Sequence, residues 1–151
     1  MDLSPDTMNA YLTHAFVGME AVLERLDDET VNERPDGWGT NSVAALVVHC
    51  CELAPFWIES PGLGRPVARD RDAEFTAEAT VAELRDRITS SRARCATLVE
   101  DLEAGPTATD HELRDFLPRG DQSDASVVLH VLEELFQHLG HMEVTADALG
   151  R

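Results

Sequence analysis

Apolar residues recur every three or four positions in four long stretches of this chain, which is the period of an amphipathic helix. The first stretch spans about residues 4–27. Ser4 can cap its N-terminus, and Pro5 suits its first turn. His14 lies on the opposite, polar face and is expected to contact solvent. We predict a helix here whose core stripe comprises Met8, Leu12, Ala15, Met19, Leu23 and Leu26.

A second helix is predicted from Thr40 or Asn41 to about Glu59. Between positions 43 and 58 it is apolar almost all round, so it should be the most buried helix of the molecule. His49 is a polar exception in the middle of this apolar stretch.

A third helix is predicted to begin at Thr80, where Thr80 and Glu83 have the spacing of a capping box. It should end at Gly105-Pro106. A fourth helix is predicted over about residues 124–149, with Ser123 or Asp124 as its cap. The stripe of the third helix comprises Val81, Leu84, Ile88, Cys95, Leu98 and Leu102.

Four amphipathic helices without a strand pattern predict an all-α four-helix bundle. The length of 151 residues suits one domain over 1–151. The connections at about 60–79 and 107–123 are long, and they could allow a crossed order of helices. Long connections in compact domains are often functional.

The charge balance excludes several classes of partner. The chain has 12 basic and 29 acidic residues, a net charge of -17, and every basic residue is arginine. This excess of acid argues against binding to nucleic acids or to anionic membranes. No apolar run approaches the roughly 20 residues of a membrane span, and the N-terminus lacks the features of a secretory signal. We therefore expect a cytoplasmic protein.

The cysteines do not form a recognisable disulfide or zinc pattern. Their number is odd and no Cys-x-x-Cys pair occurs, so Cys50, Cys51 and Cys95 are expected to be buried thiols. Cys50 and Cys51 follow His49 directly. Neighbouring residues on a helix point about 100° apart, so these thiols are not expected to share an ion with His49.

The predicted fourth helix carries a charged pair on its core face. Glu134 and His138 are spaced i, i+4 and fall in the same sector as Val127, Val131 and Met142. A carboxylate in a core costs several kcal/mol unless it is paired or coordinated. His138 alone could be the partner of Glu134, and a metal ion would satisfy both side chains.

His49 is the natural third ligand of such a metal, because it lies on the most apolar helix. The alternative is that His49 is an ordinary core histidine and that the Glu134/His138 pair is solvated. Three ligands of the His/His/Glu type would leave a coordination position open, which is typical of catalytic sites. Zinc suits these ligands best, and nickel, iron or manganese are possible.

Two segments resemble motifs of a known family. Ser42, Leu46 and His49, followed by Trp57, match a Ser-x-x-x-Leu-x-x-His opening with a later aromatic residue, in the segment that starts at Trp38. The segment His130-Val-Leu-Glu-Glu-Leu-Phe-Gln-His-Leu-Gly-His matches a terminal motif, His-x-x-x-(His or Glu)-x-x-x-His-x-Gly-(Gln or His). The chain thereby resembles the DinB-like superfamily of metal-binding helical bundles.

The resemblance implies that one divalent metal is bound by His49, Glu134 and His138. The glutamate at position 134 is similar to the branch that includes mycothiol-dependent maleylpyruvate isomerase, which uses a low-molecular-weight thiol activated by the metal. His141, at the last motif position, would be a proton carrier or a hydrogen-bond donor near the metal, with simple helix packing as the alternative. Family members often form homodimers, so a homodimer is expected.

The chain ends at Arg151, soon after the predicted fourth helix, whereas the isomerase carries a further C-terminal domain. We therefore expect a stand-alone thiol S-transferase that acts on an electrophilic small molecule in detoxification or stress response. The alternatives are a non-catalytic metal-binding stress protein and a hydrolase that uses metal-activated water.

Overall fold

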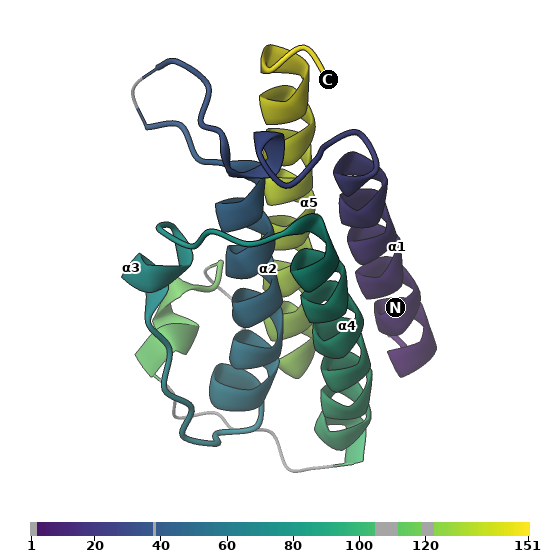
Figure 1. Cartoon of the computed structure of the whole chain (residues 1–151). Helices are drawn as coiled ribbons and strands as arrows, with labels where there is room; N and C mark the ends of the chain where they lie inside the picture. Colours follow the sequence, from purple (N-terminus) through teal and green to yellow (C-terminus); the bar gives the residue numbers. More distant parts are fainter. Residues whose placement is uncertain (1–2, 38, 105–111, 119–122) are drawn as a thin grey trace.

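The four predicted long helices are all present in the computed structural model, which describes residues 3–37, 39–104, 112–118 and 123–151 (Figure 1). The described residues contain no strand, so the all-α prediction is confirmed. The long helices are α1 Pro5–Leu23, α2 Val43–Trp57, α4 Val81–Ala104 and α5 Asp124–Ala148.

These helices pack in a crossed order. α1 and α2 each pack against both α4 and α5, so α1 and α2 lie diagonally across the bundle. The chain descends along α2, returns outside the bundle, and descends again along α4 (Figure 1). α2 and α5 are antiparallel neighbours. His49 contacts His138, and eight residues later in α2 Trp57 contacts His130, which lies eight residues earlier in α5. This order places two predicted ligand helices side by side.

The predicted helix caps are confirmed at three of four starts. The Ser4 and Ser123 hydroxyls accept from the backbone N–H groups of Thr7 and Ser126. At the start of α4, the Glu83 carboxylate accepts from the backbone N–H of Thr80 at 2.8 Å, while the Thr80 hydroxyl accepts from that of Glu83 at 3.2 Å. The predicted end of this helix, Gly105-Pro106, lies outside the described residues.

Two predicted boundaries are wrong. α2 begins after Ser42, whose hydroxyl accepts from the backbone N–H of Ala45, and not at Thr40 or Asn41. Three cap-forming residues stand in a row there, so the sequence does not decide between them. α1 ends at Leu23, four residues before the predicted end, and Leu26 is only partly buried.

The connections hold short elements that the helical period did not predict. They are η1 Thr30–Asn32, the π-helical turn η2 Ile58–Gly62, the one-turn helix α3 Arg71–Glu74 and η3 Glu112–Phe116. α3 lies against the outer side of α2 (Figure 1). The long connection between α2 and α4 therefore returns to the helix that carries His49.

The sequence was expected to contain no apolar stretch as long as a membrane span, and the helical stretch Val43–Gly62 corrects this expectation. By length and composition it could cross a membrane, with 20 residues and a mean hydropathy of 1.4. However, 83% of its apolar window is buried within the bundle, so it is the core helix. Its burial agrees with the prediction that this helix is the most buried one.

α2 also contains a proline, at position 55. Proline has no backbone N–H, so the carbonyl of Cys51 loses its usual partner four residues later. The hydroxyl of Ser91, a buried residue of α4, donates to this carbonyl at 2.9 Å. The gap in the hydrogen bonds of α2 is thus filled by the neighbouring helix.

Candidate metal centre

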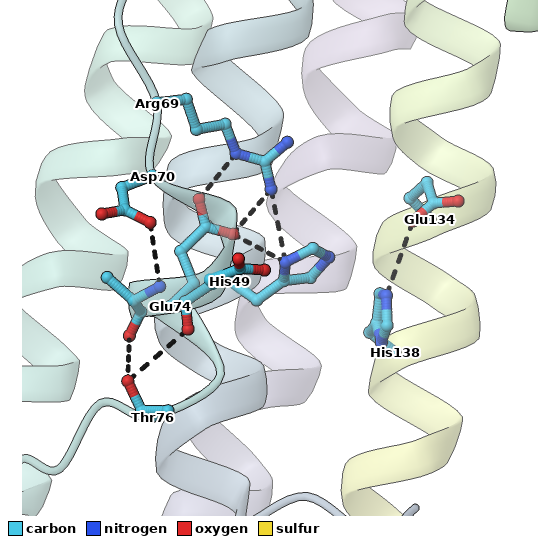
Figure 2. A network of polar contacts seen from close by, with 9 residues as sticks. His49, Arg69, Asp70, Glu74, Thr76, Glu134 and His138 are labelled. Atoms are coloured by element: carbon cyan, nitrogen blue, oxygen red, sulfur yellow. Dashed lines mark hydrogen bonds and ion pairs between the residues drawn. The ribbon is translucent and has the colours of Figure 1, made fainter.

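The structure brings together the three residues that the sequence selected. Each of His49, Glu134 and His138 offers one ligand atom, and these atoms all lie within 4.8 Å of one another. His49 comes from α2 and the other two from the facing side of α5 (Figure 2). The rings of His49 and His138 meet edge to face, with centroids 4.6 Å apart.

One nitrogen of His49 is anchored and the other is free. The side chain is 2% exposed, and Nδ1 lies 2.8 Å from Oε2 of Glu74. A carboxylate accepts hydrogen bonds, so Nδ1 is the nitrogen that carries the proton. Nε2 then presents a lone pair, and this buried atom has no hydrogen-bond partner in the protein. Such an unsatisfied buried acceptor is what a metal ligand looks like without its ion.

Glu74 is itself held by an arginine. Arg69 donates from Nε to Oε1 at 2.6 Å and from Nη2 to Oε2 at 2.7 Å, a bidentate pair (Figure 2). Glu74 is 4% exposed and Arg69 11%, so water weakens neither bond much. The ring of Phe75 stacks on His49 with centroids 4.5 Å apart. Together these residues fix the position and the proton of the His49 ring.

Sequence reasoning did not find Glu74 or Arg69. The stretch from Arg65 to Glu74 alternates charges, and the pattern does not separate the buried carboxylate from its solvated neighbours. The available signals were the unusual length of this connection and Asp70, which caps α3 by accepting from the backbone N–H of Ala73 at 3.1 Å. Those signals indicate a function for the segment without selecting the residue.

The two ligands on α5 contact each other directly. Nε2 of His138 lies 3.5 Å from an oxygen of Glu134, as the i, i+4 spacing predicts. Both side chains remain partly exposed, at 18% for His138 and 26% for Glu134. Nδ1 of His138 is buried without a hydrogen-bond partner. The pair therefore retains unused bonding capacity next to His49.

The protonation states suit metal binding. Burial lowers the pKa of His49, although the hydrogen bond to Glu74 opposes this shift, so the ring is neutral at neutral pH. The hydrogen bond with His138 is the largest of several effects that lower the pKa of Glu134, which is thus ionised. A neutral imidazole and a carboxylate are the forms that bind metals. Two nitrogens and one oxygen fit a divalent ion with an open coordination position.

A cavity of about 630 Å³ opens onto this group. His49 and Glu134 form part of its wall, so a ligand in the cavity can reach the metal position. The other lining residues are Leu53, Phe56, Trp57, Arg69, Arg71, Leu113, Phe116 and His130.

The two remaining histidines of the terminal motif occupy different surroundings. The ring of His141 stacks near His138, with centroids 6.4 Å apart, and burial is the largest cause that lowers its pKa. It does not line the large cavity. His130 lines the cavity, and its ring meets the edge of Trp57 at 4.3 Å. The proton-carrier role of His141 stays a prediction.

The three cysteines are free and buried, as predicted. Burial raises the pKa of Cys51 and of Cys95 to about 12, and it also raises the pKa of Cys50 well above its usual range. Thiols in this state are neutral at physiological pH and react poorly. The group of converging ligand atoms found among the described residues contains no cysteine.

The comparison with known families agrees with this arrangement. A family model described as the DinB superfamily matches residues 2–142, which is most of the chain. Curated proteins and solved structures yield no match.

Proposed function

The chain belongs to the DinB superfamily, and from this premise we propose that it is a metal-dependent enzyme that transfers a low-molecular-weight thiol to an electrophilic small molecule. The family is often metal-binding, and the converging His49, Glu134 and His138 fit a divalent metal. The observation that carries the proposal is the buried, unpartnered Nε2 of His49 beside the wall of a cavity of about 630 Å³.

The proposed ligands, Glu74 and His141 have separate roles in this function. His49, Glu134 and His138 would hold the cation, which we propose is zinc, and Glu74 orients His49 through its hydrogen bond with Nδ1. When bound, the cation lowers the pKa of a thiol or water at its open position and so supplies a nucleophile at neutral pH. We assign the uptake of the released proton to His141, whose ring lies next to that of His138 with centroids 6.4 Å apart.

The transfer forms one bond, between the thiol sulfur and the electrophilic carbon. The electron pair of the bond that breaks passes to a leaving group or, for an activated double bond, onto its electron-withdrawing substituent. Apolar side chains, including Leu53, Phe56 and Trp57, form part of the cavity wall and can pack against the carbon skeleton of the electrophile. A mycothiol-type thiol and a role in detoxification or stress response complete the proposal, together with a cytoplasmic location.

Direct assay of the zinc-loaded protein tests the proposal. The protein is incubated with monobromobimane and, in turn, with mycothiol, bacillithiol and glutathione, and formation of the thioether is followed by fluorescence. We expect acceleration with at least one thiol and its loss in the His138→Ala variant. A His14→Ala variant is the matched control, because His14 is exposed on α1.

Other outcomes would assign a different function. Hydrolysis of p-nitrophenyl acetate without any thiol, lost in His138→Ala, would indicate metal-activated water. A protein that binds zinc stoichiometrically but converts no electrophile with any thiol would be a non-catalytic metal-binding stress protein. The expected homodimer stays a prediction, which sedimentation analysis would decide.

A further inference from the structure

Two arginines line the large cavity of a molecule that is otherwise strongly acidic. The ten lining residues include Arg69 and Arg71 but only one acidic residue, Glu134. Glu74 neutralises Arg69 through a bidentate ion pair, so Arg71 is the lining cation that remains for a ligand, and a bound divalent cation would make the wall more positive. The whole chain has a charge of -17. Two of only 12 arginines thus line the cavity that faces the metal position.

The local backbone explains why both arginines line the cavity. Arg69 and Arg71 are two positions apart at the entry to α3, and in a near-extended segment such residues lie on the same side. Asp70 between them does not line the cavity, because its carboxylate caps α3 by accepting from the backbone N–H of Ala73. The cap thus directs the Asp70 carboxylate to the start of α3, and not to the cavity that Arg71 lines.

The two arginines differ in their bonding partners. Arg69 is bound on two atoms by Glu74, and its guanidinium lies 5.3 Å from the ring centre of Phe56. Arg71 lies 5.3 Å from the ring centre of Phe75 and, among the described residues, forms no ion pair. Its planar donor fork is consequently free, and such a fork matches the two oxygens of a carboxylate.

The remainder of the wall suits an apolar molecule. Five of the ten lining residues are apolar, and three of them are aromatic. Phe116 of η3 lines this cavity and is 73% exposed, and such exposure of a large aromatic residue is typical of a binding site. The five are Leu53, Phe56, Trp57, Leu113 and Phe116.

We propose that the cavity binds a small molecule with a flat apolar body and one carboxylate, and that Arg71 recognises the carboxylate. The apolar body lies against the aromatic walls. The proposal rests on the proposed function in one respect, since it identifies this molecule as the class of electrophile that reacts at the metal. A monoanion matches the one arginine of the wall, Arg71, that has no carboxylate partner among the described residues.

Equilibrium binding of two probes of equal shape tests this recognition. Cinnamate and cinnamamide differ in the charge of one terminal group, and calorimetry measures the affinity of each for the zinc-loaded protein. The amide cannot form the bidentate ion pair with Arg71, so we expect cinnamate to bind about tenfold more tightly than cinnamamide. Arg71→Gln should abolish this preference, and Arg71→Lys should restore part of it.

The matched control is Arg85→Gln, which removes one positive charge from an exposed position of α4 outside the cavity lining. This variant should keep the full preference for cinnamate. A preference that survives Arg71→Gln would mean that the metal alone binds the anion, and it would overturn the proposal. Equal affinities of the wild-type protein for both probes would overturn it as well.

The binding experiment contains no thiol, so its result is independent of the transferase assay. A preference lost in Arg71→Gln supports carboxylate recognition even if no thiol is ever transferred. Conversely, thiol transfer together with equal binding of the two probes would leave the transferase proposal standing and remove this one.

Discussion

At the scale of single residues, the candidate centre depends on a carboxylate that does not face the metal position. Glu74 accepts the Nδ1 proton of His49 at 2.8 Å and is itself held by the fork of Arg69. The hydrogen bond aims the free nitrogen of His49 at α5. In metal proteins, such partners of ligating histidines raise the basicity of the ligand and limit its rotation.

We therefore expect Glu74→Gln to weaken zinc binding about tenfold or more, within the ~10–100-fold range typical of this kind of partner. The amide still accepts a hydrogen bond but carries no charge to stabilise the ligand. Competition with a chromophoric chelator gives the dissociation constant. Glu78→Gln is the control, because Glu78 is an exposed acid of the same connection.

The substitution also leaves Arg69 without its carboxylate, so circular dichroism and thermal unfolding of the metal-free variant must show that it is folded. Zinc affinity equal to that of the wild-type protein in a folded Glu74→Gln variant would mean that Glu74 does not support the ligand.

The three proposed ligands were predictable from the sequence because helical periodicity places them. Glu134 and His138 lie about one helical turn apart on the face that points to the core, and His49 interrupts an apolar helix. Glu74 had no such signal. It ends a one-turn helix in a connection of alternating charges, and its burial depends on how that connection folds back on α2. Tertiary contacts of this kind leave no local pattern.

At the scale of the helices, α2 depends on its neighbour to remain regular. Pro55 deprives the Cys51 carbonyl of its partner, and the buried hydroxyl of Ser91 supplies a donor from α4. This contact lies half a turn beyond His49 and joins two parallel helices.

Ser91→Ala should lower the free energy of unfolding by about 1–3 kcal/mol, because it leaves a buried carbonyl without a donor. Urea denaturation measures this change. Ser90→Ala is the matched control, since Ser90 is the exposed neighbour on the same helix and should change stability by less than about 0.5 kcal/mol. Equal effects of the two substitutions would show that the hydroxyl of Ser91 is not the partner that matters.

The long helices and their core faces were predictable, whereas the short elements were not. Stripes at three- and four-residue spacing identify α1, α2, α4 and α5 within a few residues. η2 and α3 are too short to show a period, and both depend on contacts with α2. The position of the connection outside the bundle, which delivers Arg69, Arg71 and Glu74 to the site, follows from the packing of the whole chain.

At the scale of the whole molecule, the candidate ligands connect two helices of the bundle. A cation that binds the folded protein and not the unfolded chain stabilises the fold by mass action. At a free zinc concentration one hundred times the dissociation constant, the gain is about 2.7 kcal/mol.

For a chain of this size, we expect zinc to raise the thermal midpoint by about 5–10 °C and chelation to reverse the shift. The shift should diminish on acidification, because protons compete for the imidazoles. Differential scanning calorimetry measures both effects. His138→Ala should lose the shift and His14→Ala should retain it, and an equal shift in both variants would place the zinc elsewhere.

The distance along the chain between the ligands has a consequence for the kinetics of folding. More than half of the sequence separates His49 from Glu134, so the three donors meet only after a very long segment has closed. In the unfolded chain, Glu134 and His138 are the two proposed ligands that lie close together in sequence, so the chain binds a cation only weakly. Bound zinc should therefore lower the unfolding rate while leaving the refolding rate nearly unchanged.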